Sequence, residues 1–401
     1  MVGYLPEWQI YSGFYPKNLI TDGSAPLLTH VLYAFANLPA PGSPGAGTCQ
    51  LGDPWADYEM PVSAADSVDG VADEPTSTLH GNFNQLVKLK KAFPNLKLMI
   101  SVGGWSWSSG FSAAASTEES RKTLVASCIS TFIEGHFTDP TDYSVTYPGI
   151  FNGIDIDWEY PGACGNTCAY SPDDTQNFTL LMAEFRRQLD AETEKTHVPY
   201  LLSIAAPAGE SDYSLIQLGA IHPYLNFINL MTYDLNGAWN NYADHAAPLF
   251  TSPTDPIPAD KGNNVDSTVT AYLEKGVPAR QINVGIPFYG HGWSGVVKKN
   301  NGLYQPASGA APDDQAYYNV LQTLTGFDPH YDPLSGMAHW IFSPATATFY
   351  SYDDRVSVFV KALYIRTREL GGAMFWDLTG DDANGTLIHS IANGLVVPKH
   401  L

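Results

Sequence analysis

Short apolar runs alternate along the chain with longer stretches of helical periodicity. Eight of the runs have the length and residue types of strands, and they cover 2–5, 29–35, 97–102, 153–158, 201–205, 227–231, 282–286 and 372–376. Helical patterns lie between several of them, at 83–93, 118–134, 173–193 and 267–274. Alternating strands and helices indicate a parallel sheet, and eight such units suit a closed (β/α)8 TIM barrel of the α/β class.

A doubly wound open sheet is the structural alternative to the barrel. Such a sheet usually has a glycine-rich phosphate-binding turn after its first strand. Here the first strand is followed by Pro6-Glu7-Trp8-Gln9-Ile10, which holds no glycine. The barrel is therefore favoured.

Two stretches interrupt the alternation. Residues 39–77 are rich in Gly, Pro, Ser and Asp and predict a long loop after the second strand. Residues 289–353 separate the seventh and eighth strands by too much chain for one crossover, and they hold many aromatics between turn signals. We expect a small α+β insertion domain over 289–353 that forms a wall of the barrel's cleft, with 1–288 and 354–401 making the barrel.

Composition and charge narrow the class of protein. Of the 401 residues, 44% are hydrophobic and 15% charged, so the chain can bury a large core. Acidic residues outnumber basic ones 41 to 20, and the net charge of −21 disfavours nucleic acid and anionic membranes as partners. No apolar run is long enough to span a membrane. The chain enters a strand at once with no signal peptide before it, so we interpret it as the mature or trimmed form of a secreted, monomeric protein.

The four cysteines also favour an oxidising compartment. Cys164 and Cys168 lie four residues apart in a loop without neighbouring metal ligands, so a local disulfide is expected rather than a metal site. Cys49 and Cys128 could pair, or Cys128 could be a buried free thiol. Asn177 and Asn384 begin possible glycosylation sequons.

The fourth predicted strand carries the most informative chemistry. Because strand side chains alternate, Asp155, Asp157 and Glu159 point one way, at intervals of about 6–7 Å, while the apolar residues between them point the other way. Like charges and burial raise the pKa of such carboxyls, so some keep a proton near neutral pH. A proton-holding acid beside ionised partners is what cleavage of a glycosidic bond requires, and a strand's carboxyl end is where barrel active sites lie. A metal site or an outward-facing acidic stripe is the alternative, but a metal site usually draws ligands from other strands as well.

The segment 151–161 resembles the D-x-x-D-x-D-x-E signature of glycoside hydrolase family 18, the chitinases and their relatives. Other motifs of that family follow in the expected order: Ser101-Val102-Gly103-Gly104, Met231-Thr232-Tyr233-Asp234, and Trp376 at the end of the last strand. The long insertion is similar to the extra α+β domain of its deep-cleft chitinases. The resemblance covers nearly the whole chain, from residue 4 to residue 376.

The resemblance implies a reaction without an enzyme nucleophile, no cofactor and no metal. The N-acetyl carbonyl oxygen of the substrate attacks the anomeric carbon, and an oxazolinium ion forms with net retention. Glu159 is then the general acid and later the base, Asp157 contacts the acetamide N–H, and Asp155 shares a proton with Asp157. Tyr233 donates its hydroxyl to the acetamide oxygen.

The same resemblance assigns a set of substrate-binding residues, with chitin and chitooligosaccharides as the partners. These residues are Tyr4, Phe35, Ser101, Trp105, Tyr160, Met231, Asp234, Trp239, His291 and Trp376. Tyr4 and Ser101 are expected to hydrogen-bond Asp155, and Trp376 to form the floor under the sugar. Trp107, Trp293 and Trp340 fit either a sugar groove or the core. Singly, Ser101, Tyr4, Met231 and Trp376 also fit structural roles, and their order along the chain is what favours function.

Two positions depart from the family pattern. Asn152 stands where the signature often has its first Asp, which predicts a modest effect on the acid network. His291 stands where relatives often carry Arg, so a sugar contact of the guanidinium would be missing or made by His291.

Three rival functions share the predicted scaffold. A carbohydrate-binding lectin would usually lack the acid, but Glu159 is present. An endo-β-N-acetylglucosaminidase would keep the same acids, although the insertion and the tryptophan-rich loops favour a long linear polymer. A storage or structural barrel is disfavoured because burying three acids is costly.

Overall fold

The computed structural model describes residues 1–137, 145–257 and 262–396. Parts of the predicted barrel segments, at 138–144, 258–261 and 397–401, lie outside these residues. Eight parallel strands form a closed barrel in the order β1-β13-β7-β6-β5-β4-β3-β2, which confirms the predicted (β/α)8 class. They span Val2–Pro6 (β1), His30–Ala36 (β2), Lys97–Gly103 (β3), Gly153–Asp157 (β4), Leu201–Pro207 (β5), Phe227–Met231 (β6), Ile282–Pro287 (β7) and Gly372–Trp376 (β13).

The chain divides into two compact units. One comprises Val2–Pro207 and Ser211–Ile228, and the other comprises Met1, Ala208–Glu210 and Asn229–Leu401. The predicted domain boundary at 289 does not coincide with this division, and a separate domain over 289–353 stays a prediction.

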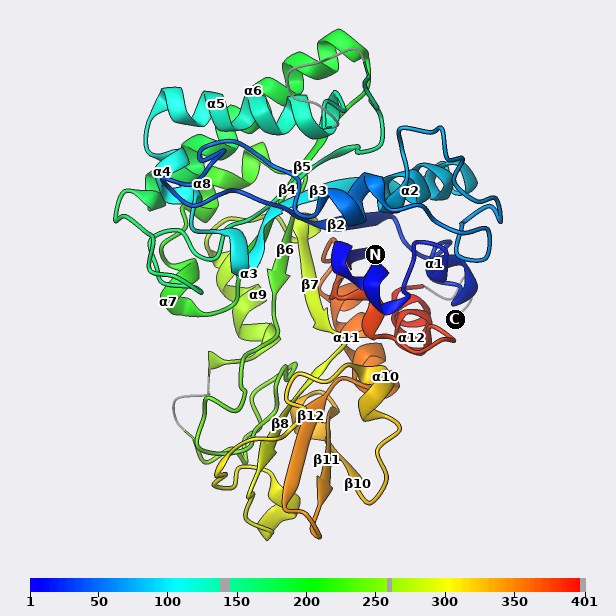
Figure 1. Ribbon diagram of the computed structural model, residues 1–401. Helices are drawn as coiled ribbons and strands as arrows, with labels where there is room; N and C mark the ends of the chain where they lie inside the picture. The colour runs from blue at the N-terminus through cyan, green and yellow to red at the C-terminus, as the bar shows by residue number, and fades with distance from the viewer. Residues whose placement is uncertain (138–144, 258–261, 397–401) are drawn as a thin grey trace. The chain divides into compact units, whose positions relative to one another are not determined.

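The first unit holds strands β1 to β5 and the helices that cover them. These helices are α1 (Asn18–Thr21), α2 (Gly81–Ala92), α3 (Gly104–Trp107), α4 (Phe111–Ala115), α5 (Glu118–Cys128), α6 (Asp174–Thr196) and α8 (Leu218–Ile221). In Figure 1, α5 and the long α6 lie side by side. Buried aromatics join strand to helix, since Phe83 of α2 meets Tyr33 of β2 at 5.4 Å and Phe151 at 5.3 Å between ring centroids.

Two disulfides fasten loops of this unit. Cys164 pairs with Cys168, as expected, and Cys49 pairs with Cys128 at the end of α5. The predicted helix over 118–134 ends as an α-helix at Cys128, and one π-helical segment, Ile129–Ile133, continues it.

The second unit holds β6, β7, β13 and a five-stranded antiparallel sheet. The sheet has the order β10-β11-β12-β8-β9, with strands Asp328–Asp332, Ala338–Ser343, Thr348–Tyr352, Gly290–Ser294 and Gly309–Ala310 in that order. It lies within the predicted insertion of 289–353. Its helices are α9 (Val265–Glu274), α10 (Tyr318–Leu321), α11 (Arg355–Thr367) and α12 (Thr386–Leu395), and α11 packs against α12. The short helix α7 (Glu210–Tyr213) has its first residue in this unit and its other residues in the first unit.

The antiparallel sheet has an aromatic core of its own. Trp293, Trp340, Phe342 and Phe349 are buried together in it. Among the residues that the structure describes, no helix has both the length and the apolar character that crossing a membrane requires.

Candidate active site

Alternation along β4 places its acidic and apolar side chains on opposite faces, as predicted. Trp158, just beyond the strand, stacks on Phe111 of α4 at 5.2 Å and meets Phe178 of α6 edge-on at 5.4 Å. The other face carries Asp155 and Asp157, which are 0% and 4% exposed. An outward acidic stripe is thereby excluded.

Asp155 is held by three hydroxyl groups from three strands. Tyr4 of β1 and Ser101 of β3 each donate to Oδ2 at 2.8 Å, and Ser203 of β5 donates to Oδ1 at 2.5 Å. The strand register explains the convergence, because Ser101, Asp155 and Ser203 are direct neighbours across β3, β4 and β5. The contacts expected for Tyr4 and Ser101 are therefore present, and Ser203 adds one that was not foreseen.

Asp157 lies in a different environment from Asp155. Its Oδ1 atom is buried without a hydrogen-bond partner among the described residues. Burial raises the pKa of Asp157 well above its usual range, and the nearby charges of Glu159 and Asp155 raise it further. Asp157 thus holds a proton in conditions where an exposed carboxyl would have lost it.

Glu159 is the only member of the three acids with a partly exposed side chain. Its backbone N–H donates to Ser108 Oγ at 2.9 Å, and that hydroxyl contacts the carbonyl oxygens of Gly104 and Asp157 at 2.8 and 3.1 Å. Ser108 therefore fixes the backbone on both sides of Trp158. The sequence analysis did not predict it, because a serine directly after a short helix carries no motif.

The two glycines where β3 ends and α3 begins leave room for this arrangement. Gly103 has φ +104°, and a Cβ there would lie 2.4 Å from the carbonyl oxygen of Asp157. Gly104 has φ +74°, and a Cβ there would lie 2.6 Å from the ring of Phe35. A side chain at either position would displace a residue of the candidate site.

Several predicted sugar-contacting residues surround these acids. Trp105 is 52% exposed on α3, whereas Phe35 is 8% exposed and lies 6.5 Å from the ring of Tyr4. Tyr160 follows the acids directly, and burial together with the charge of Glu159 raises the pKa of its hydroxyl. All of these residues belong to the first unit.

The short disulfide loop lies against the same segment. A Cβ at Gly165, between Cys164 and Cys168, would come within 2.2 Å of the carbonyl oxygen of Glu159 and 3.5 Å of the Trp105 ring. The loop therefore borders the backbone that carries the exposed acid.

The remaining predicted site residues belong to the second unit. Met231 and Tyr233 are each 9% exposed, and Trp376 is half-buried at the end of β13. The Tyr233 ring meets the Tyr289 ring edge-on at 6.3 Å.

Asn152, which stands in the first unit at a departure from the family pattern, hydrogen-bonds the backbone of Leu98 and so links β3 to the start of β4.

Asp234 and His291 form a pair in the second unit. His291 Nε2 lies 2.7 Å from Asp234 Oδ1, and the hydroxyl of Tyr289 donates to the same oxygen at 2.5 Å. His291 is 1% exposed. Both of its ring nitrogens face carboxylates, and a contact of His291 with sugar stays a prediction.

The tryptophans separate into exposed and buried residues. Trp239 is 58% exposed and packs edge-on against His291 at 5.0 Å, while Trp107 is half-buried. Trp293 and Trp340 are 0% and 6% exposed, so of the two alternatives that the sequence left open they belong to the core of the antiparallel sheet. Four exposed aromatics of the first unit went unforeseen, namely Trp8, Tyr11, Trp55 and Tyr170.

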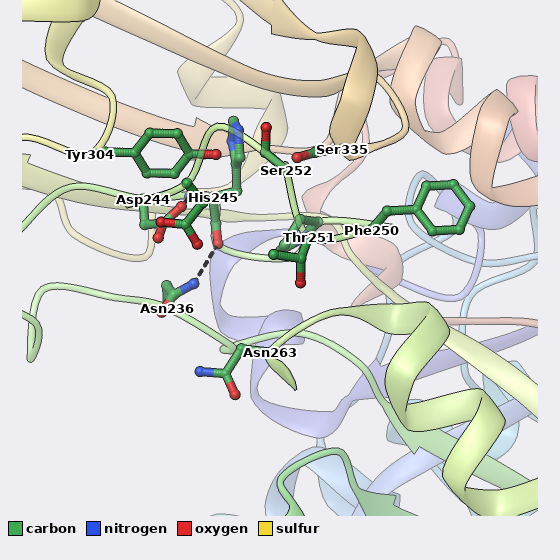
Figure 2. Close-up of a pocket in the computed structure, with 11 residues that line it drawn as sticks. Asn236, Asp244, His245, Phe250, Thr251, Ser252, Asn263, Tyr304 and Ser335 are labelled. Carbon is green, nitrogen blue, oxygen red and sulfur yellow. Dashed lines mark hydrogen bonds between the residues drawn. The ribbon is translucent and has the colours of Figure 1, made fainter. Parts of the chain in front are cut away.

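A small polar pocket in the second unit involves none of the predicted site residues. Figure 2 shows its lining, where Asn236 donates to the carbonyl oxygen of His245 at 3.1 Å. Asp244, Ser252 and Tyr304 line it as well. Its residues come from the chain between β6 and α9 and from the insertion.

Comparison with known proteins agrees with the motifs. The family described as Glycosyl hydrolases family 18 matches residues 1–381. Chitinase A1 of Niallia circulans is 34% identical, with 95% of this chain and 56% of the relative aligned, and Chitinase C of Streptomyces lividans is 35% identical, with 96% and 58% aligned. The solved catalytic domain of psychrophilic chitinase B from Arthrobacter TAD20 has a TM-score of 0.90 and 37% identity, covering 98% of this chain and 94% of that domain. The chain thus spans little more than half the length of the two curated relatives.

Proposed function

The chain belongs to glycosyl hydrolase family 18, and we propose that it is a chitinase that hydrolyses β-1,4-linked N-acetylglucosamine polymers with retention. The observation that carries this proposal is one strand with three acids in three different environments. Asp155 is fully buried under three hydroxyl donors, Asp157 is buried with an unpartnered oxygen, and Glu159 is partly exposed.

These environments favour catalysis assisted by the substrate. A retaining enzyme of the two-carboxylate type needs an ionised carboxylate as its nucleophile. Asp157 is poorly suited to that task, because burial and the neighbouring charges of Glu159 and Asp155 raise its pKa and so oppose its ionisation. An N-acetyl group on the substrate can supply the attacking oxygen instead, and N-acetylglucosamine carries that group beside the anomeric carbon.

Glu159 has the exposure that proton transfer to a bound sugar requires. In the first step it gives its proton to the glycosidic oxygen as that bond breaks and the acetamide oxygen bonds to the anomeric carbon. In the second step the Glu159 carboxylate takes a proton from water, and that water opens the oxazolinium ion.

Asp157 and Asp155 act on the charge that develops in the first step. Asp157 accepts a hydrogen bond from the acetamide N–H, which carries positive charge in the ion. Asp155 lies two residues before Asp157 on β4. A proton passed from Asp157 to Asp155 lets Asp157 ionise when the cation forms. The hydroxyls of Tyr4, Ser101 and Ser203 keep Asp155 in place for this exchange.

Residues of the other family motifs take the remaining roles. Tyr233 donates its hydroxyl to the acetamide oxygen and orients it for attack. Asp234 contacts the sugar at the cleavage point, and Trp376 packs against that sugar's apolar face. Trp105 and Trp239, which are both more than half exposed, stack on further sugars.

Substrate and setting follow from the same proposal. The partners are chitin and chitooligosaccharides, as the names of the chitinase relatives suggest, and no second protein is required. The two disulfides favour an extracellular location. We expect the enzyme to act as a monomer.

The test is hydrolysis of a chitin hexasaccharide by the wild type and by Glu159→Gln. The substitution keeps shape and removes only the transferable proton, so we expect the fold to persist and turnover to fall at least a hundredfold. Glu119→Gln, an exposed change on α5, is the matched control and should keep wild-type rates. Glu159→Gln activity above a tenth of wild type would contradict the role of Glu159. Tight binding without turnover by the wild type would identify a lectin instead.

A further inference from the structure

His291 of β8 lies between two carboxylates. Its Nε2 atom is 2.7 Å from Asp234 Oδ1 and its Nδ1 atom is 3.1 Å from Asp314 Oδ1. A neutral imidazole carries one N–H and can donate to only one acceptor. Because both neighbours are acceptors, the arrangement fits an imidazolium that donates to each.

Asp314 is itself fixed by the backbone of the antiparallel sheet and its loop. Its Oδ1 atom accepts hydrogen bonds from the N–H groups of Gly292 at 2.9 Å and of Gln315 at 3.0 Å, in addition to the contact with His291. Three donors on one oxygen favour the carboxylate form, and hydrogen bonds from His291 and Gly292 lower the pKa of Asp314 against the opposing effect of burial. Asp314 is thus a fixed negative charge behind His291.

In the described part of the chain, hydrogen bonds hold Asp234, at the other end, through one carboxylate oxygen only. Tyr289 and His291 both donate to Oδ1, and the side chain is 43% exposed. Its backbone has φ +53°, a conformation that a residue other than glycine keeps where its surroundings hold it. The other oxygen, Oδ2, is left to accept from a ligand.

The charges that face His291 are few. Among the residues that the structure describes, only the carboxylates of Asp234 and Asp314 contact it, and the rings of Trp239 and Tyr289 pack edge-on at 5.0 and 5.8 Å. Burial alone would lower the pKa of His291, but the two carboxylates outweigh it and raise that pKa to about 9.

We propose that Asp314 is a positioning residue, which acts through the His291 imidazolium to hold Asp234 in the orientation that the reaction needs. Asp314, His291 and Asp234 are called here the carboxylate–histidine relay. The catalytic role of this relay rests on the proposed function, whereas the positive charge of His291 between the two carboxylates does not. The positive charge beside Asp234 therefore depends on Asp314.

The relay has a definite pH dependence. The pKa of His291 is raised from its ordinary value of about 6.5 to about 9. The stabilisation that the charged His291 gives to the folded protein is therefore complete below pH 6.5, and it is lost as pH rises through about 9. Removing the charge of Asp314 should lower the pKa of His291 and move this loss to lower pH.

The first experiment titrates His291 by NMR in protein with ¹⁵N-labelled histidine, without any substrate. We compare the wild type with Asp314→Asn, which keeps the side-chain oxygen but not the charge. Asp313→Asn, which removes a neighbouring exposed charge outside the relay, is the matched control. We expect the His291 pKa to fall by about 1 unit or more in Asp314→Asn and to stay within a few tenths of wild type in Asp313→Asn. An unchanged His291 pKa in Asp314→Asn would overturn the relay, and Asp314→Ser repeats the test if the Asn variant does not fold.

The second experiment measures kcat/KM for a chitooligosaccharide as a function of pH. In Asp314→Asn the alkaline limb should move to lower pH by the same amount as the His291 titration, while Asp313→Asn leaves it in place. Adding His291→Arg to Asp314→Asn should restore activity at alkaline pH, because a guanidinium stays charged without Asp314. A shifted titration with an unshifted rate profile would overturn the positioning role. A wild type that does not hydrolyse the substrate would instead contradict the proposed function, and the NMR result would still decide the relay.

Discussion

Asp155 shows how far single residues could be assigned from sequence. Tyr4 and Ser101 were predicted to contact it because both belong to motifs at barrel strands, and both do. Ser203 was not, although it makes the shortest of the three hydrogen bonds. Its strand carries no motif, and the register that sets Ser203 beside Asp155 depends on how β5 pairs with β4.

Ser203→Ala should destabilise the protein by about 1.5–3 kcal/mol, because it removes a hydrogen bond from a fully buried carboxyl group. Urea unfolding gives the value. Ser214→Ala, at an exposed position in the same unit, is the control and should change stability by less than about 0.5 kcal/mol. Equal effects of the two substitutions would show that the Ser203 hydroxyl does not support Asp155.

The sequence alone did not decide which of the tryptophans are exposed and which are buried. Trp105 and Trp239 are exposed as expected, whereas Trp293 and Trp340 are buried. A sequence rich in aromatics and turns fits a sugar groove and a small hydrophobic core equally well. The antiparallel pairing of β8 with β12 and of β12 with β11 decides between them, and that pairing is tertiary information.

At the scale of elements, every predicted barrel strand is present within a residue or two of its expected bounds. Their apolar runs are continuous because parallel barrel strands are covered on both faces. The helices α11 and α12 were missed. A signal for α11 existed, since Asp354 and Ser357 form a capping box at its start.

The two disulfides should differ in what they contribute to stability. In the chain-entropy picture, closing the loop between Cys164 and Cys168 stabilises by about 2 kcal/mol, and closing the 79-residue separation between Cys49 and Cys128 by about 4.5 kcal/mol. Paired Cys→Ser variants of each bridge, compared by urea unfolding, test this. A larger loss for the short loop would mean that its contact with Glu159 and Trp105, and not chain entropy, dominates.

At the scale of the whole molecule, stability should fall as pH rises from about 6.5 towards 9. Burial raises the pKa values of Glu7 and Asp157, so the folded state keeps protons that the unfolded chain has lost. His291 acts in the same sense, and Lys90, whose pKa burial lowers to about 8, acts in the opposite one. The growing negative charge on a chain already at −21 adds to the decline.

Urea unfolding at pH 6.5 and pH 8.5 in one salt concentration measures this trend. Glu7→Gln should reduce the difference between the two conditions, because the amide has no proton to lose. Stability that is equal at both pH values, or greater at 8.5, would show that the buried acids are ionised in the folded protein.

The central claim is that the N-acetyl group of the substrate, and no side chain, attacks the anomeric carbon under proton transfer from Glu159. The most direct measurement is the anomeric configuration of the first product, followed by proton NMR within the first minutes of chitin hexasaccharide hydrolysis. Retention predicts that the β-anomer appears first and then equilibrates slowly with the α-anomer. Initial release of the α-anomer would mean direct displacement by water and would contradict the account.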